Sequence, residues 1–455
     1  MKEKCAVFGI ISEEEVFSKI YFGLYSMQHR GQESAGIATF SDGKIHLHKE
    51  MGLVVDVFKN IYMQGNVGIG HVRYSTTGSS EIKNSQPLMI TYSKGTFAIA
   101  HNGNLTNYQD IKEILERKGA VFSTTSDTEV IAQLIAHEHI KTENFMEGLK
   151  NAMRLLDGAY SLTMLNDKGE LIAVRDPWGF RPLCLGKLPS GYVVASETCA
   201  FDILSAIHLR DVKPGEIIIF NGKNMISEIG RIEKQKHCMF EYVYFSRSDS
   251  FINGIPVYQT RKNLGKNLYE EKPTKADIVT AVPDSGITAA IGYHHASGIK
   301  YSESLIKNRY TGRTFIMPEQ KIRESSVKVK LSPVVSEIKG KEIILIDDSI
   351  VRGTTIKNLV NLLKKAGAKK VHVRITCPPL KYPCFYGVDM KTRKEFIASE
   401  KTVEEICKEI GADSLYYNSL DGLVKSIGIE KENLCLACLT GEYPVREKQI
   451  KLKVG

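Results

Sequence analysis

Short apolar runs separated by glycine and polar turns fill the first half of the chain. Their spacing predicts a sheet-rich, layered domain. The runs that we expect to form strands are residues 67–72, 97–100, 160–165, 171–174 and 192–195. Two helices interrupt them, one after Ser12 with Glu15 as its capping-box partner and one after Ser126 with Glu129 in the same relation.

The sequence pattern changes near residue 275, where predicted strands, glycine-bearing loops and helices begin to alternate. We expect buried strands at residues 277–282, 342–346 and 371–376, and a helix at residues 355–365. This alternation is typical of a doubly wound parallel sheet. Residues 225–270 connect the two regimes, and we place the domain boundary near residue 235.

Length and charge fit two domains that bind small phosphorylated molecules. A chain of 455 residues is too long for one ordinary core. No stretch approaches the roughly 18 apolar residues that span a bilayer, and the run at residues 5–11 is too short for a secretory signal. We therefore expect a cytoplasmic protein with no membrane partner. The net charge of +9 is spread along the chain, which favours small phosphates over nucleic acid as partners.

A pair of acids follows the apolar run at residues 342–346. These acids, Asp347 and Asp348, would lie at the carboxyl end of a strand, where open α/β sheets bind ligands. The loop that follows can surround a phosphate with N–H groups and hydroxyls, and it opens a helix whose dipole favours the anion. The acids can hold a ribose diol or Mg²⁺. The loop residues concerned are Ser349, Arg352, Gly353, Thr354 and Thr355.

This block resembles the phosphoribosyl-pyrophosphate motif of type I phosphoribosyltransferases. The resemblance implies that Asp347 and Asp348 meet the ribose hydroxyls and Mg²⁺, and that residues 349–355 hold the 5′-phosphate. The turn at residues 282–286 is similar to the pyrophosphate-side loop, and we expect its Ser285 to join the two acids at Mg²⁺. Residues 307–315 resemble the mobile loop that closes over the substrate, with Lys307 and Arg313 as its cations.

Cys5 begins an apolar run close to the start of the chain. If residues 1–4 are removed, Cys5 carries a thiol and a free α-amino group, whose reference pKa of roughly 7.7–8.0 suits a general base. Such a thiol can attack an amide carbonyl without a separate histidine. Asn102 and the Gly103 N–H can form an oxyanion hole, Arg73 can clamp a carboxylate, and Asp127 can receive an ammonium group.

Together with residues 28–36 and 126–129, these stretches resemble the class II, or N-terminal-nucleophile, glutamine amidotransferases. The resemblance implies an αββα sandwich in the first half of the chain. It also implies glutamine cleavage by the Cys5 nucleophile, with the roles given above for the other residues. We interpret His71 and His101 as buried structural histidines.

The chain has nine cysteines, which are poor disulfide candidates in a cytoplasmic protein. Cys435 and Cys438 form a Cys-x₂-Cys pair that can bind one metal centre. Spacing alone does not choose the further ligands among Cys238, Cys377, Cys384 and Cys407. One branch of the amidophosphoribosyltransferases carries a [4Fe–4S] cluster on cysteines in the contexts of Cys238, Cys384, Cys435 and Cys438, and this resemblance implies the same ligands here. A zinc site would use the same four cysteines.

The order of the motifs on one chain resembles the amidophosphoribosyltransferase family as a whole. It implies an enzyme that passes ammonia from glutamine to phosphoribosyl pyrophosphate, giving 5-phosphoribosylamine, glutamate and pyrophosphate in the first step of purine synthesis. Residues 1–4 would be a removed leader, residues 5–235 the glutaminase domain, and residues 236–455 the phosphoribosyltransferase domain with a cluster-binding tail. The resemblance also implies a homotetramer inhibited by purine nucleotides.

Two alternatives stay open at this point. One is another class II amidotransferase, which would share the first half of the chain. The other is a regulator that binds phosphoribosyl pyrophosphate without catalysis and would need a DNA-binding module in place of the glutamine machinery.

Overall fold

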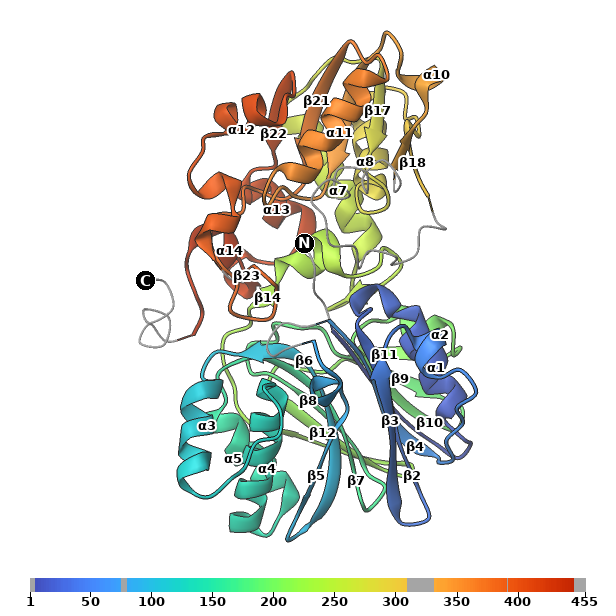
Figure 1. Cartoon of the computed structure of the whole chain (residues 1–455), viewed down its shortest axis with the longest axis vertical. Helices are drawn as coiled ribbons and strands as arrows, with labels where there is room; N and C mark the ends of the chain where they lie inside the picture. Colours follow the sequence, from blue (N-terminus) through green and yellow to red (C-terminus); the bar gives the residue numbers. More distant parts are fainter. Residues whose placement is uncertain (1–4, 75–79, 309–330, 391, 446–455) are drawn as a thin grey trace.

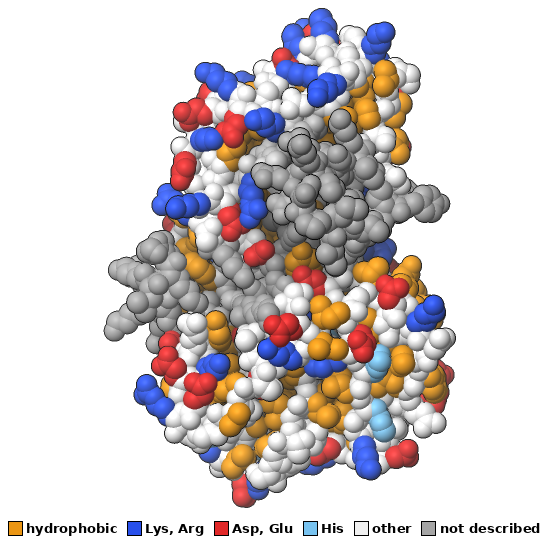
Figure 2. All heavy atoms as spheres, in the orientation of Figure 1, with side chains coloured by type: hydrophobic (Ala, Val, Ile, Leu, Met, Phe, Trp, Pro, Cys, Tyr) orange, Lys and Arg blue, Asp and Glu red, His pale blue; other side chains and the backbone are white. Residues whose placement is uncertain are grey.

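The computed structural model describes residues 5–74, 80–308, 331–390 and 392–445. Two units follow each other along the chain, the first with stacked sheets between helices and the second with a smaller parallel sheet (Figure 1). Among the described residues no helix is long and apolar enough to cross a membrane. Figure 2 shows basic and acidic side chains interspersed over one face of the molecule.

Two antiparallel sheets stack face to face in the first unit, with a buried apolar layer between them. The seven-stranded sheet has the order β11 (Ile207–Asp211), β9 (Cys184–Leu188), β10 (Gly191–Ala195), β1 (Ala6–Ser12), β4 (Val67–Arg73), β2 (Ser34–Ser41) and β3 (Lys44–Met51). The six-stranded sheet has the order β13 (Asn224–Ile229), β12 (Glu216–Asn221), β8 (Leu171–Arg175), β7 (Gly158–Asn166), β6 (Gly95–Leu105) and β5 (Leu88–Tyr92).

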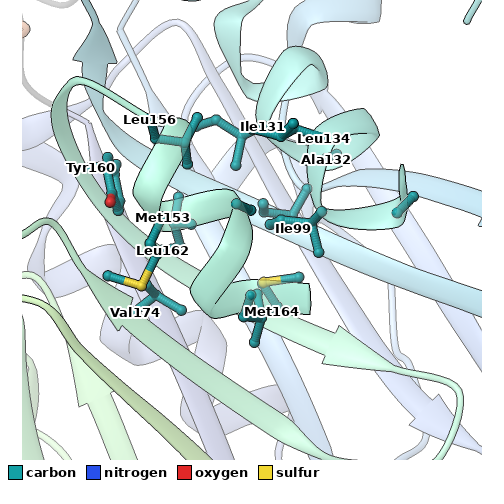
Figure 3. Close-up of a cluster of buried hydrophobic side chains, with 14 of the residues drawn as sticks. Ile99, Ile131, Ala132, Leu134, Met153, Leu156, Tyr160, Leu162, Met164 and Val174 are labelled. Carbon is teal, nitrogen blue, oxygen red and sulfur yellow. The ribbon is translucent and has the colours of Figure 1, made fainter. Parts of the chain in front are cut away.

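Helices cover the outer face of each sheet. The seven-stranded sheet is covered by α1 (Phe17–Ser26), α2 (Val54–Val57) and α6 (Cys199–Asp202). The six-stranded sheet is covered by α3 (Tyr108–Arg117), α4 (Asp127–Thr142) and α5 (Phe145–Leu155). Between the six-stranded sheet and its helices, one buried cluster contains Ile131 and Leu134 of α4 together with Leu162 and Met164 of β7 (Figure 3). This arrangement confirms the αββα sandwich expected from the sequence.

The two predicted helix starts in this unit differ in detail from the structure. The prediction of a helix directly after Ser12 is wrong, because β1 continues through that residue and α1 begins at Phe17. Ser126 does cap α4 through its side chain. The Glu129 carboxylate, however, accepts from the N–H of Ser123 at 2.9 Å in the preceding loop, so it does not complete a capping box.

The second unit is built on a four-stranded parallel sheet with the order β17 (Ile278–Ala281), β20 (Glu342–Asp347), β21 (Lys370–Ile375) and β22 (Ser414–Tyr417). One face packs on α7 (Val257–Glu271) and α8 (Ile287–Ser297), the other on α11 (Thr354–Lys365) and α12 (Val403–Ile410). The doubly wound sheet is thus confirmed. Other elements of this unit include β15 (Phe251–Ile252), β16 (Ile255–Pro256), β18 (Leu305–Lys307), β19 (Leu331–Pro333), α10 (Val335–Ile338) and α13 (Leu420–Ile427).

A short parallel pair joins the middle of the chain to its C-terminal region. The strand β14 (His237–Cys238) pairs with β23 (Leu434–Cys435), which α14 (Ala437–Thr440) follows. The register places Cys238 opposite Cys435. Just after β14, residues Glu241–Phe245 form a π-helical turn. The boundary near residue 235 stays a prediction.

Candidate active sites

The predicted nucleophile and the predicted carboxylate clamp share one end of the seven-stranded sheet. Cys5 directly precedes β1, and its side chain is buried. Its Sγ donates to the carbonyl oxygen of Tyr74 at 3.3 Å, just beyond the end of β4. The register pairs Ala6 with Val72, so Arg73 lies at the same end of the neighbouring strand.

The predicted oxyanion residues lie on β6 of the other sheet, and Ser196 connects them to the nucleophile's strand. Ser196 Oγ accepts from Asn102 Nδ2 at 3.4 Å and from the Val7 N–H at 2.9 Å. Val7 is two residues from Cys5 along β1. The two sheets are therefore joined by side-chain hydrogen bonds directly beside Cys5.

Gly103 is held between β7 and a segment of the second unit. A β-carbon at Gly103 would lie 2.0 Å from the carbonyl oxygen of Ala159, which excludes every other residue type at this position. A β-carbon at Gly387 would lie 3.0 Å from the carbonyl carbon of Gly103. Beside it, Asn104 Nδ2 donates to the carbonyl oxygen of Phe385 at 2.9 Å. This part of β6 is therefore in contact with residues of both units.

Asp127 lies beside the end of the same strand, close to His101. As the first residue of α4, it is 3% exposed, and its carboxylate accepts from the Leu105 N–H at 3.0 Å. The His101 Nδ1 lies 3.8 Å from Asp127 Oδ1. His71 Nε2 lies 3.1 Å from the His101 carbonyl oxygen. Both rings are buried, and the structural role of these two histidines stays a prediction.

His71 gives a prediction for the pH dependence of stability. Burial lowers the pKa of His71 to about 3, whereas an unfolded histidine titrates near 6.5. Below about pH 6.5 the unfolded chain takes up a proton that the folded protein does not, so stability falls as the pH falls toward 3. We expect His71→Asn to remove about 2 kcal/mol of the stability lost between pH 7 and pH 5. Thermal midpoints of both proteins at the two pH values measure this, and equal shifts would contradict it.

A buried ion network behind Cys5 was not predicted from the sequence. Arg30 Nε donates to the Cys5 carbonyl oxygen at 3.0 Å, and Arg30 Nη1 donates to Glu197 at 2.5 Å. The Glu241 carboxylate accepts from Arg30 at 2.9 and 2.8 Å and from Arg181 at 3.1 Å. Burial alone would raise the pKa of Glu241, but the charges of Arg30 and Arg181 outweigh it and hold that pKa below its usual value.

A cavity of about 700 Å³ opens where the parallel strands end. Its lining brings together the predicted phosphate and Mg²⁺ residues Ser285, Asp347, Asp348, Ser349, Arg352, Gly353, Thr354 and Thr355. Lys307 lies close by, with its Nζ 2.5 Å from Oδ2 of Asp284 in the turn that contains Ser285. Arg313 lies outside the described residues.

The two acids of this cavity are buried side by side. Asp347 and Asp348 are each 7% exposed, and the Asp348 N–H donates to Asp347 Oδ1 at 2.9 Å. Burial and the neighbouring charge of Asp348 raise the pKa of Asp347 well above its usual range. With the Ser285 hydroxyl, they form an oxygen-rich donor set of the kind that suits Mg²⁺.

The loop after these acids has the geometry of a phosphate site. Gly353 has a φ of +77°, which favours glycine, and α11 begins at the next residue with its first N–H groups unpaired within the helix. Arg352 Nη2 donates to Glu395 at 2.8 Å. Glu395, Asp389 and Tyr244 also line the cavity and were not predicted from the sequence. Tyr244 belongs to the turn that supplies Glu241 to the network behind Cys5.

The four predicted cluster cysteines line a second, smaller pocket. Cys238 and Cys435 face each other in the β14–β23 pair, and Cys384 and Cys438 complete the set. Burial raises the pKa of all four thiols, that of Cys238 to about 11. Burial thus disfavours the thiolate forms, and a bound cation would have to offset this cost before the four cysteines could act as thiolate ligands.

Comparisons with known proteins cover both units. A glutamine amidotransferase domain model matches residues 71–202, and a phosphoribosyl transferase domain model matches residues 255–408. The chain is 53% identical to an amidophosphoribosyltransferase of Methanocaldococcus jannaschii, over 97% of each chain. It is 49% identical to that of Bacillus subtilis, over 98% of this chain and 94% of the other.

A solved structure agrees with these sequences. The glutamine phosphoribosylpyrophosphate amidotransferase from B. subtilis, complexed with ADP and GMP, superposes with a TM-score of 0.91 at 48% identity, over 97% of this chain and 98% of that chain. Another class II amidotransferase would share only the first unit, and a non-catalytic regulator would lack it. The chain belongs to the amidophosphoribosyltransferase family.

Proposed function

We propose that glutamine is cleaved at Cys5 and that the released ammonia is added to phosphoribosyl pyrophosphate beside Asp347 and Asp348. The observation that carries this proposal is the cavity that Asp347, Asp348 and the loop at residues 349–355 line together. Hydrogen bonds through Ser196, which link Asn102 to the strand that begins next to Cys5, support the glutamine site. We further propose residues 5–235 as the glutaminase domain and residues 236–455 as the phosphoribosyltransferase domain.

In the glutamine half-reaction, the α-amino group of Cys5 takes the thiol proton as sulfur attacks the side-chain amide carbonyl. Asn102 Nδ2 and the Gly103 N–H hold the oxyanion, which is worth about 3 kcal/mol per donor in such sites. The amide C–N bond then breaks, ammonia leaves with the proton, and water hydrolyses the thioester to glutamate. Arg73 and Asp127 hold the α-carboxylate and α-ammonium groups of glutamine.

In the second half-reaction, ammonia forms a bond to C1 of the ribose while the bond to pyrophosphate breaks, and the new ammonium group then loses a proton to solvent to give the amine. The loop at residues 349–355 and the start of α11 hold the 5′-phosphate. Asp347, Asp348 and Ser285 would hold Mg²⁺, which neutralises charge on the pyrophosphate when bound. Lys307 and Arg313 would face the same leaving group.

Four thiols that line one pocket support a [4Fe–4S] cluster on Cys238, Cys384, Cys435 and Cys438. Zinc is the competing occupant, and iron and sulfide analysis of anaerobically purified protein distinguishes the two. The ADP and GMP in the B. subtilis structure support inhibition of this chain by purine nucleotides. We also propose that the protein is cytoplasmic and forms a homotetramer.

Glu241 is expected to position the nucleophile, because it clamps the Arg30 side chain that binds the Cys5 carbonyl oxygen. Glu241→Gln leaves two buried guanidinium groups with less compensating charge, which typically costs about 3–5 kcal/mol of stability. We expect glutamine-dependent synthesis to fall about tenfold more than ammonia-dependent synthesis, since a tenfold change corresponds to ~1.4 kcal/mol of lost positioning.

The rates with glutamine and with ammonia, measured on the same preparation, check this expectation. Glu233→Gln is a matched control, because it removes a more exposed pairing with Arg231. An equal fall in the glutamine-dependent and ammonia-dependent rates of Glu241→Gln would show that Glu241 has only a structural role.

The proposal as a whole is tested by glutamine hydrolysis that depends on phosphoribosyl pyrophosphate, combined with the intact mass of the active protein. We expect glutamate and pyrophosphate in equal amounts, and a mass that lacks residues 1–4. Full glutamine-dependent activity in a protein that retains those residues would exclude the α-amino group of Cys5 as the base.

A further inference from the structure

Three potential metal ligands meet at one edge of the seven-stranded sheet. Cys184 belongs to β9, and His208 and Asp211 belong to the edge strand β11. One ligand atom from each of the three lies within 4.8 Å of the other two. None of the three lines the phosphoribosyl cavity or the pocket of the four cysteines.

A β-bulge in β11 creates this cluster. His208 pairs with Gly186 and Asp211 pairs with Cys184, although His208 and Asp211 are three residues apart and their partners only two. Side chains of directly paired residues point to the same face, and residues two apart on β9 share a face. The extra residue in the bulge therefore brings His208 and Asp211 to the face of Cys184, whereas a regular strand would turn one of them away.

The contacts around the cluster leave its ligand atoms with few partners. Cys184 is fully buried and donates to Asp211 Oδ1 at 3.5 Å, a contact within the cluster itself. Among the described residues, no hydrogen-bond partner reaches the enclosed His208 Nε2. Buried polar atoms normally have a partner, so such an atom calls for an explanation.

Charge and chemistry both favour a soft divalent cation. The adjacent Arg210 is directed to Glu216, with two contacts of 2.7 Å, so its guanidinium is already engaged there. A thiolate and a carboxylate together balance a charge of two. Sulfur, imidazole nitrogen and carboxylate oxygen are the ligand types of zinc, and three protein ligands leave one position for water.

We propose that Cys184, His208 and Asp211 form a zinc site that fastens the edge strand β11 to β9. Zinc binding releases the Cys184 proton to solvent and joins two strands that are otherwise held by ladder hydrogen bonds at the edge of the sheet. The site is independent of both half-reactions, so its role is structural.

Zinc titration of the purified full-length chain tests the proposal, with Zn²⁺ alone as the probe. We expect His208→Gln and Asp211→Asn each to bind about one zinc ion per chain fewer than the wild type. The four-cysteine pocket is the same in all these proteins, so its contribution cancels. His46→Gln is the matched control, because His46 lies on β3, the opposite edge strand of the same sheet.

Thermal unfolding supplies a second measurement on the same proteins. Added Zn²⁺ should raise the midpoint of the wild type and of His46→Gln more than that of His208→Gln or Asp211→Asn, because only the first two keep all three ligands. Zinc content that is equal in the wild type and in both β11 variants would overturn the proposal, as would equal midpoint shifts in folded protein.

Discussion

Cys5→Ser is expected to lower glutamine-dependent synthesis about 1,000-fold or more, while ammonia-dependent synthesis stays within about twofold of the wild type. The serine hydroxyl is a far weaker nucleophile than the thiol it replaces, and no other side chain in the proposed mechanism attacks the amide. The second half-reaction uses a cavity in the other unit, which Cys5 does not line. Initial rates with each nitrogen donor, at saturating phosphoribosyl pyrophosphate, measure the separation.

Cys407→Ser is the matched control for this variant. Cys407 is a half-buried thiol on α12, and it lines neither pocket. Both of its rates should remain near those of the wild type. Glutamine-dependent synthesis that survives in Cys5→Ser would contradict the assignment of the nucleophile, and a parallel loss with ammonia would show that Cys5 supports the fold instead.

The grouping of the predicted phosphate and Mg²⁺ residues around one cavity was predictable because most of them are close together in the sequence. A single stretch, residues 342–355, forms the strand β20, the two acids and the loop that opens α11. Local patterns report such a site directly, since the strand, the turn and the helix start each have their own residue preferences. The capping box at the start of α12 is local in the same way, because Thr402 and Glu405 are only three residues apart.

The surroundings of Cys5 could not be predicted in the same way. Glu241 binds Arg30 across 211 positions of sequence, and nothing local to either residue marks the pairing. The four-cysteine set could not be predicted from spacing either, because spacing does not distinguish Cys384 from Cys377 as a ligand. Only the tertiary structure brings Cys384 to the wall shared with Cys238. Contacts of this kind follow from how the two units pack, and that information is spread over many residues.

The bulge in β11 is a third case. Alternating apolar and polar positions predict a strand, but they do not show where an extra residue shifts the register between His208 and Arg210. The grouping of His208 with Cys184 therefore has no sequence signature, and neither β9 nor β11 is among the strands expected from the sequence.

Asp347→Asn is expected to lower the rate of synthesis about 100- to 1,000-fold with either nitrogen donor. The variant loses a proposed Mg²⁺ ligand, and this loss removes several kcal/mol of transition-state stabilisation. The Mg²⁺ concentration that gives half-maximal activity should rise as well. Rates with glutamine and with ammonia across a Mg²⁺ titration measure both effects. Glu342→Gln is the control, since Glu342 lies at the other end of β20 and pairs with Lys369 and Lys370.

The stability of this variant distinguishes a binding role from a structural one. The pKa of Asp347 is raised well above its usual range by burial and by Asp348, so its charged form opposes folding at neutral pH when no cation is bound. Asn keeps an oxygen that can accept from the Asp348 N–H but carries no charge. In the absence of Mg²⁺, the thermal midpoint of Asp347→Asn should therefore equal or exceed that of the wild type. An inactive variant with a clearly lower midpoint would mean that Asp347 maintains the loop, whereas activity loss without destabilisation is what a cation ligand predicts.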